Sequence, residues 1–118
     1  TIEDVQADRV GIARRKAQEW GAVVVLKGAR TVVADPDGPA AIVPTGNPGM
    51  ATGGTGDVLA GLLGALLAGG MRPREAARVA AWVHGRAGDI AASRYGERGM
   101  VASDLAGSIG AVWAAWDR

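Results

Sequence analysis

Apolar residues recur along the chain at spacings that predict one long helix, three short strands and three further helices, in that order. In the first helix, the residues at helical spacing are Val10, Ala13, Ala17 and Trp20, which we expect to face inward. We expect Thr1 to cap this helix and Gly21 to end it, because both residue types are common at those positions. The charged residues between the apolar positions are expected to face solvent.

Residues 22–26 form a continuous, largely β-branched run, which is typical of a strand buried on both faces of a parallel sheet. Residues 31–34 and 40–43 predict two more strands, and Asp-Pro-Asp-Gly at 35–38 predicts the tight turn between them. We expect these two strands to form an antiparallel hairpin at the edge of the sheet. A helix followed at once by a buried strand indicates an α/β fold.

Residues 57–68 are apolar on almost every side, which predicts a buried helix that ends at Gly69-Gly70. Gly61 and Gly64 lie inside this helix, and each would weaken an exposed helix by about 1 kcal/mol relative to Ala. We therefore expect both glycines to permit the close approach of a neighbouring element.

The last two helices are expected to begin at Arg72-Pro73 and at a capping Ser103. The inward positions expected for them are Ala76, Ala80, Val83, Ala87 and Ile90, then Leu105, Ile109, Val112 and Trp116. The residues expected on the solvent side of the first of these helices are Arg74, Arg78, Arg86 and Asp89.

The length and composition fit one domain with a buried core. The chain has 118 residues, of which 48% are hydrophobic, and a net charge of +1 from 13 basic and 12 acidic residues. That charge balance gives no reason to expect nucleic acid or a membrane surface as a partner. The absence of cysteine excludes a disulfide framework and a Cys-ligated metal. The apolar run over 58–68 is too short to span a bilayer, so a cytoplasmic location is expected.

A glycine-rich loop precedes the apolar helix at residues 57–68, and its five glycines are Gly46, Gly49, Gly53, Gly54 and Gly56. Glycine lets backbone N–H groups turn inward, and a helix N-terminus adds unpaired N–H groups and a partial positive charge. Together these features predict a seat for an anion such as phosphate. The carboxylate of Asp57, in the first helical turn, could deprotonate a hydroxyl that attacks phosphorus. No Lys-Ser or Lys-Thr follows the last glycine, so the loop is not a Walker loop.

The whole string Asn-Pro-Gly-Met-Ala-Thr-Gly-Gly-Thr-Gly-Asp-Val-Leu-Ala-Gly, at 47–61, closely resembles the signature of the NAD(P)H-hydrate dehydratases of the ribokinase-like superfamily. Further matching segments are 26–31, 34–38, 84–89 and 99–105. The resemblance implies a three-layer α/β/α domain. Ribokinase-like domains are usually more than twice this length, so residues 1–118 are expected to be the C-terminal part of one.

The resemblance also implies roles for individual residues. Asp57 would contact the substrate hydroxyl that is to be phosphorylated, and Gly54, Thr55 and Gly56 would form the anion hole for the phosphoryl group. The adenine nucleotide, ADP or ATP, would be bound by Lys27, Gly28, Ala29, Arg30, Thr31 and Gly56. Arg30 is expected to point its side chain to solvent. Mg²⁺ is expected with the nucleotide, although no metal ligands are recognised in this chain.

Asn47, His84 and three of the tryptophans each allow more than one role. Asn47 could bond its own loop backbone, which we favour, or contact phosphate or the water shell of a metal. His84, the only histidine, is more consistent with a packed, hydrogen-bonded residue than with a ligand. The tryptophans Trp82, Trp113 and Trp116 are spaced as core or subunit-interface residues, and we expect a homo-oligomer.

The activity implied by the resemblance is the nucleotide-dependent dehydration of hydrated NADH or NADPH, a metabolite-repair reaction. The resemblance to bacterial members implies an ADP-dependent enzyme, although the residues themselves do not distinguish ADP from ATP. Two alternatives stay open: a ribokinase-like kinase acting on a vitamin precursor or sugar, and a non-catalytic nucleotide-binding module. The Asn-Pro-Gly-Met segment argues against the kinase. We expect the 118 residues alone to show weak activity or none.

Overall fold

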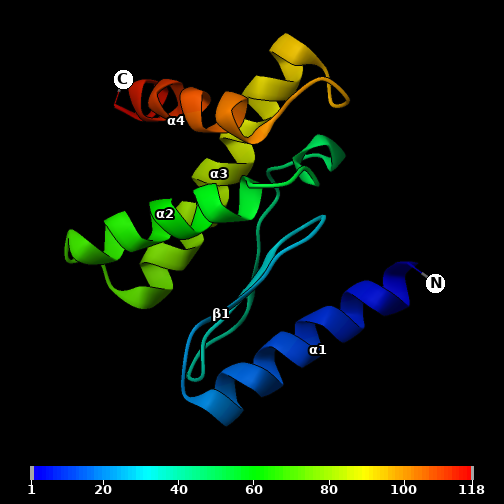
Figure 1. The fold of residues 1–118 in the computed structure, drawn as a ribbon. Helices are drawn as coiled ribbons and strands as arrows, with labels where there is room; N and C mark the ends of the chain where they lie inside the picture. The colour runs from blue at the N-terminus through cyan, green and yellow to red at the C-terminus, as the bar shows by residue number, and fades with distance from the viewer. Residues whose placement is uncertain (1, 118) are drawn as a thin grey trace.

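A computed structural model describes residues 2–117, so the predicted Thr1 cap lies outside the described residues. The elements, in chain order, are α1 (Ile2–Trp20), β1 (Val24–Leu26), β2 (Val32–Ala34), β3 (Ala41–Ile42), the 3₁₀ helix η1 (Pro48–Met50), α2 (Thr55–Ala68), α3 (Pro73–Tyr95) and α4 (Ala102–Trp116). The small sheet lies between α1 on one side and the other three helices on the opposite side (Figure 1). No helix in the described range is both long and apolar enough to cross a membrane.

The three strands form an antiparallel sheet in the order β1-β2-β3. β2 is central: Leu26 of β1 is opposite Val32, and Ala41 of β3 is opposite Val33. The predicted hairpin of the second and third strands is confirmed. The expectation of a parallel sheet with β1 buried on both faces is wrong for the described residues, because β1 is half-buried and pairs there only with β2.

Side chains of β2 alternate between the two faces of the sheet and so join the helices on either side to it. Val32 and Ala34 pack with Ala13 and Ala17 of α1. Val33 faces the other way and packs with buried alanines of α3, Ala77 and Ala81. The result is the helix–sheet–helix layering of an α/β/α fold. Trp20 does not belong to this core, contrary to the prediction, because its side chain is 61% exposed.

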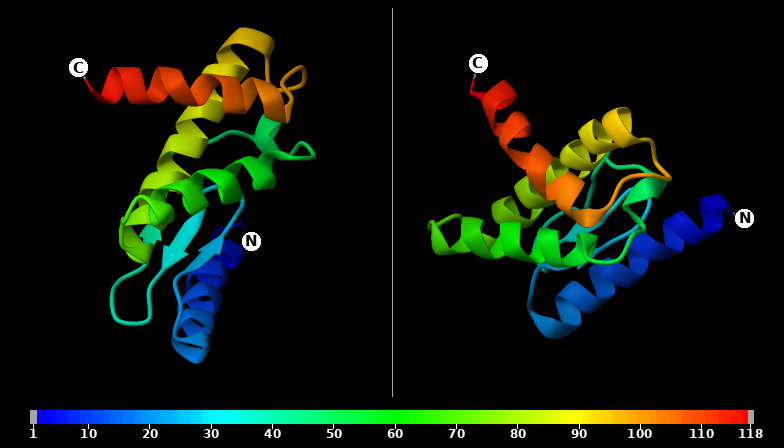
Figure 2. Two further views of the ribbon diagram at one scale, coloured as in Figure 1. Left: turned by 60° about the vertical axis from the view of Figure 1, so that its left-hand side comes forward. Right: turned by 45° about the horizontal axis from the view of Figure 1, so that its top comes forward.

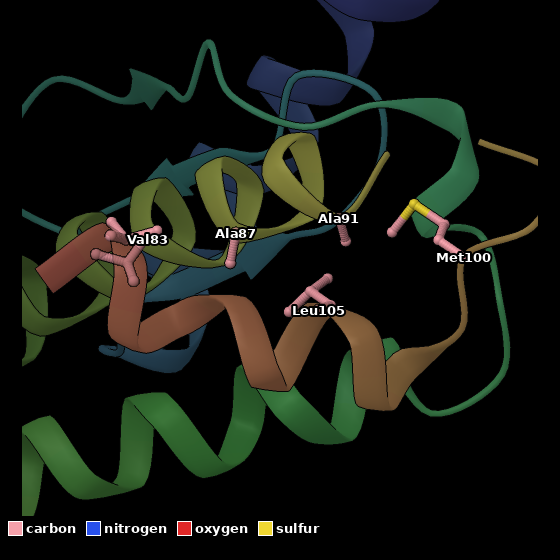
Figure 3. Close-up of a cluster of buried hydrophobic side chains, with 6 residues drawn as sticks. Val83, Ala87, Ala91, Met100 and Leu105 are labelled. Carbon is pink, nitrogen blue, oxygen red and sulfur yellow. The ribbon is translucent and has the colours of Figure 1, made fainter. Parts of the chain in front are cut away.

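A second core region lies between α3 and α4, on the far side of α3 from α1. Figure 3 shows Leu105 of α4 close to the row of Val83, Ala87 and Ala91 on α3, with Met100 at the end of that row. The predicted inward stripe of α4 is only partly confirmed, because Leu105 and Val112 are buried while Trp116 is 52% exposed.

The start of α4 also differs from the prediction. The helix begins two residues earlier than a Ser103 cap requires, with Val101 at the N-cap position. There the Asp104 carboxylate accepts a hydrogen bond of 2.9 Å from the Val101 backbone N–H. A carboxylate in the first turn also interacts favourably with the helix dipole, so Asp104 fulfils the capping role expected of Ser103.

Helix α2 is buried on one side and exposed on the other, although its sequence is apolar almost all round. Only Thr55 and Leu59 are buried, on the side that packs against α3 and α4. The prediction of a fully buried helix is therefore wrong. The reason proposed for Gly61 and Gly64 is wrong too, because a β-carbon at either position would meet nothing within 4 Å. The right-hand view in Figure 2 shows α2 lying along the outside of the molecule.

The C-terminal end of α2 and the start of α3 agree with the sequence. Helix α2 stops at Ala68, and Gly70 takes a φ of 95°, a value that suits glycine. Pro73 is the first residue of α3, where its missing N–H costs no helical hydrogen bond.

Candidate nucleotide and phosphate site

The glycine-rich loop enters α2 through a left-handed residue, which explains one of its glycines. Gly54, at the N-cap of α2, has a φ of 93°, and a β-carbon there would lie 3.1 Å from that of Ala102. Both the conformation and the close approach of α4 favour glycine. The chain then turns directly into the first helical turn, which presents Asp57 with an exposed side chain.

The backbone donors of this first turn are not all equally available. The Thr55 N–H donates to the carbonyl of Thr52 at 3.3 Å, and the first intrahelical bond runs from the Val58 N–H to Gly54 at 3.2 Å. The N–H groups of Gly56 and Asp57 have no acceptor within the helix, because the first turn of any helix lacks the preceding carbonyls. An anion at this end of α2 would therefore meet Gly56 and Asp57 first.

The side chain of Thr55 holds the loop rather than facing a ligand. Its hydroxyl is within hydrogen-bond distance of two carbonyl oxygens, that of Met50 at 2.6 Å and that of Thr52 at 3.0 Å. Thr55 is 7% exposed. If Thr55 contributes to an anion hole, the contributing group is therefore its backbone N–H and not its hydroxyl.

Lys27 reaches the same helical turn from the end of β1. A β-carbon placed on Gly56 would lie 2.5 Å from the Lys27 Nζ, so the ammonium group rests directly against Gly56. Two segments predicted separately to bind a nucleotide, the residues after β1 and the start of α2, are thereby neighbours in space. The missing side chain at Gly56 leaves the room that the lysine uses.

His84 lies under the start of α2. Its Nε2 is 2.8 Å from the Thr55 carbonyl oxygen, and since a carbonyl can only accept, Nε2 carries the hydrogen. Burial lowers the pKa of His84 below 6.5; the hydrogen bond to Thr55 opposes this shift, and the positive charge of Lys27 adds to it. The prediction of a packed, hydrogen-bonded histidine is confirmed.

Asn47 and Asp89 together fix the first part of the loop. Asn47 caps η1 by accepting from the Gly49 N–H at 3.0 Å, and its amide donates to one oxygen of Asp89 at 2.9 Å. The second Asp89 oxygen accepts from the Gly46 N–H at 3.1 Å. The loop role favoured for Asn47 is shown by these bonds. The solvent-side placement of Asp89 is wrong, because its half-buried carboxylate is bonded to the loop.

Helix α3 carries two glycines where the loop lies against it. A β-carbon on Gly85 would overlap Thr45, and one on Gly88 would overlap the side chain of Met50. Gly85 lies three positions before Gly88 and four before Asp89, and residues at these spacings are neighbours on a helix surface. His84, four positions before Gly88, borders the same face of α3. The spacing of His84-Gly85 and Gly88-Asp89 could have predicted that a loop packs against this face of α3, but the sequence interpretation missed it.

The residues predicted to bind the nucleotide form a short exposed turn after β1. Arg30 has a φ of 60°, unusual for a residue with a side chain, and its exposed side chain confirms the expectation. The Thr31 hydroxyl donates to the carbonyl of Gly28 at 3.4 Å, across the turn. Arg9 of α1, which the sequence interpretation also missed, donates to four backbone carbonyls of this turn and the end of β1.

The tryptophans lie elsewhere. Trp82 and Trp116 contact edge to face at 5.4 Å between ring centroids, and Trp113 lies 5.7 Å from Trp116. Trp82 and Trp116 also line an open pocket of about 370 Å³ between α3 and α4, together with Arg86, Ile90, Val112 and Ala115. None of the predicted nucleotide or anion-hole residues lines it.

Comparison with known proteins agrees with this geometry. A family model described as NAD(P)H-hydrate dehydratase matches residues 1–110. The chain belongs to the NAD(P)H-hydrate dehydratase family. It is 54% identical over 105 residues to the bifunctional NAD(P)H-hydrate repair enzyme Nnr of Moorella thermoacetica, covering 89% of this chain and 20% of that protein. It is 46% identical over its full length to the ADP-dependent (S)-NAD(P)H-hydrate dehydratase of Neisseria meningitidis, of which it covers 38%.

A solved dehydratase structure confirms the fold. The chain superposes with a TM-score of 0.87 on the ADP/ATP-dependent NAD(P)H-hydrate dehydratase of Bacillus subtilis, which was co-crystallised with ATP and Mg²⁺. The two are 32% identical, and the match covers 97% of this chain and 41% of the Bacillus protein. The predicted ribokinase-like α/β/α fold, present in part, is thus confirmed. The chain spans from 20% to 41% of the length of these three relatives.

Proposed function

We propose that this chain supplies the nucleotide and phosphate site of an ADP- or ATP-dependent dehydratase that restores NADH and NADPH from their hydrates. The observation that carries the proposal is the meeting of Lys27 and Gly56 at the N-terminus of α2, beside the exposed Asp57. A cation, a helix N-terminus and a free carboxylate at one place suit phosphoryl transfer to a hydroxyl.

In the proposed reaction, the substrate hydroxyl attacks the terminal phosphorus of the nucleotide and the bond to the bridging oxygen breaks. The carboxylate of Asp57 takes the hydroxyl proton as the new P–O bond forms. The backbone N–H groups of Gly54 and Gly56 stabilise the charge on the moving phosphoryl oxygens, and that of Thr55 joins them once it leaves the carbonyl of Thr52. Phosphate then leaves the ring with the electrons of the C–O bond, the lone pair of the ring nitrogen assists, and loss of a ring proton gives NAD(P)H.

The nucleotide is assigned to residues 27–31, at the end of β1, with Gly56. The Lys27 ammonium acts as a point charge on the phosphates, since it already lies against the helix start where a phosphate would be held. Thr31 is occupied in part by the Gly28 carbonyl, so its proposed contact with the nucleotide requires its hydroxyl to turn.

Mg²⁺ is the group least supported by this chain's own residues. Over the described range, no group of three His, Asp or Glu side chains could hold a metal ion. The carboxylate of Asp89, near the loop, already accepts hydrogen bonds from Gly46 and Asn47. We therefore assign no Mg²⁺ ligand and no step of the reaction to a metal bound by these residues.

Calorimetry with ADP and ATP tests the proposal on the chain itself, because binding needs only the site described here. ADP is expected to bind wild-type chain, and Lys27→Met is expected to weaken binding about tenfold, since a charged hydrogen bond contributes about 1.5 kcal/mol. Asp57→Asn should leave ADP affinity within about twofold, because its partner is the substrate hydroxyl. Failure of the wild-type chain to bind either nucleotide would contradict the proposal.

A kinase acting on a vitamin precursor or sugar would use the same site, and its product separates it from a dehydratase. A kinase accumulates a phosphorylated product, whereas a dehydratase releases phosphate and restores the near-ultraviolet absorbance of NADH. A third possibility, a module that only binds nucleotide, would show calorimetric binding without either product.

We also propose that the chain self-associates through the surface between α3 and α4. Trp116 is 52% exposed there although it packs edge to face with Trp82. Large exposed aromatic groups beside a cavity are typical of protein interfaces. Light scattering should show an oligomer for wild-type chain and a smaller species for Trp116→Ser; a wild-type monomer would contradict this proposal.

A further inference from the structure

One arginine on α1, Arg9, donates hydrogen bonds to several backbone carbonyls of the turn that follows β1. The Arg9 Nη2 donates to the carbonyls of Leu26 at 3.1 Å and Lys27 at 3.0 Å. Its Nη1 donates to the carbonyls of Ala29 at 2.9 Å and, more weakly, Arg30 at 3.5 Å. Four of five consecutive carbonyls over 26–30 are thus turned toward a single guanidinium.

This arrangement also decides where the amide groups of the turn point. The peptide bonds are trans, and in a trans peptide the C=O of one residue and the N–H of the next point in opposite directions. Carbonyls of residues 26, 27, 29 and 30 that face α1 therefore turn the N–H groups of residues 27, 28, 30 and 31 away from α1. That is the side of the sheet on which α2 lies (Figure 1). Gly56 of α2 lies there against the Lys27 ammonium.

The backbone of the turn needs such support. Arg30 has a φ of 60° and Gly28 a φ of 155°, both outside the regions that residues with side chains prefer. Gly28 is also held close to the arginine, because a β-carbon there would lie 2.7 Å from Arg9 Nη2. A side chain at position 28 would displace the guanidinium from the turn.

We propose that Arg9 is a positioning residue for nucleotide binding: by holding the carbonyls of residues 26–30, it directs their N–H groups toward the phosphates of a bound adenine nucleotide. The proposal rests on the proposed function, because the nucleotide is its ligand. Lysine cannot replace Arg9 fully, since the planar guanidinium presents several donors in a fixed fork while an ammonium offers a single nitrogen.

The test compares ADP affinity, by calorimetry well below each melting temperature, for wild type, Arg9→Gln, Arg9→Lys and Arg14→Gln. Arg14 is an exposed arginine on the same helix and serves as the matched control. Arg9→Gln is expected to raise the Kd for ADP about tenfold and Arg9→Lys about threefold, while Arg14→Gln stays within about twofold. Amide hydrogen exchange at residues 27–31 should quicken in Arg9→Gln.

The possible results separate this inference from the function on which it rests. A lower melting temperature with an unchanged Kd in Arg9→Gln would show a merely structural arginine and overturn the inference alone. A wild-type chain that binds no ADP contradicts the proposed function, and the positioning role with it. If Arg9→Gln does not fold, Arg9→Lys decides: an unchanged Kd in that variant overturns the inference.

Discussion

Lys27 and Gly56 are 29 positions apart in the sequence, yet the lysine ammonium occupies the space that a side chain at position 56 would fill, 2.5 Å from where its β-carbon would lie. The contact joins the end of β1 to the first turn of α2. It brings the cation and the helix N-terminus to one place, as a phosphate site requires.

Gly56→Ala should therefore weaken ADP binding more than it changes stability. The added methyl group must displace the ammonium, and we expect the Kd for ADP to rise about tenfold. Gly61→Ala, in the same helix, has nothing within 4 Å of the new methyl group and should raise the free energy of unfolding by about 0.5–1 kcal/mol. Equal ADP affinities in the two variants would show that Lys27 does not act at this position.

Asp89→Ala is expected to loosen the glycine-rich loop. It removes the acceptor of two hydrogen bonds, from Gly46 and Asn47, and should lower the free energy of unfolding by about 1–3 kcal/mol. Asp37→Ala is the control, because Asp37 lies in the exposed turn between β2 and β3. Urea unfolding of both variants measures the difference, and an Asp89→Ala chain as stable as the control would refute the loop role.

Gly88→Ala should be more destabilising than an ordinary helix glycine replacement. The methyl group would overlap the Met50 side chain, and such overpacking costs about 1–3 kcal/mol. Gly107→Ala in α4 meets nothing within 4 Å and is expected to be neutral or stabilising. The double variant Gly88→Ala, Met50→Ala should recover part of the loss; no recovery would mean that Met50 is not the group displaced.

The pH dependence of stability should carry the signature of His84. Burial lowers its pKa in the folded chain below the 6.5 of the unfolded chain. Above pH 6.5 neither state holds the proton and stability is full; below it the unfolded chain takes up a proton that the folded chain resists, so stability falls until the pH passes the folded pKa. Urea unfolding between pH 7.5 and about 5 measures this slope.

His84→Gln isolates that effect, because the chain has one histidine and glutamine can still donate to the Thr55 carbonyl. The variant should show a flatter stability profile across the same range. An unchanged slope would assign the pH dependence to the carboxylates instead.

The sequence predicted well whatever depends on neighbours along the chain. Gly70 and Pro73 marked the boundary between α2 and α3, and the residues on either side of the 35–38 turn formed the hairpin. Helical spacing found the buried alanines of α1 and α3, because a helix repeats its inward face regularly.

The sequence failed where the result depends on partners far along the chain. Helix α2 is apolar all round, yet over the described residues only one of its faces meets other elements. The helical spacing of Asp89 predicted a residue facing solvent. In the structure its carboxylate accepts two hydrogen bonds from the glycine-rich loop, which lies more than 40 positions earlier in the sequence. Arg9 was one basic residue among several on a helix, and only the three-dimensional fold shows which carbonyls surround it.

The measurement that tests the central claim most directly is a titration of isotopically labelled chain with ADP, followed by the backbone amide signals. A nucleotide site at the junction of β1 and α2 predicts that the largest shifts fall on residues 27–31 and 54–57. In Lys27→Met both groups of shifts should need about tenfold more ADP to reach half their full size. Shifts confined to the Trp82 and Trp116 surface, or no shifts at all at saturating ADP, would contradict it.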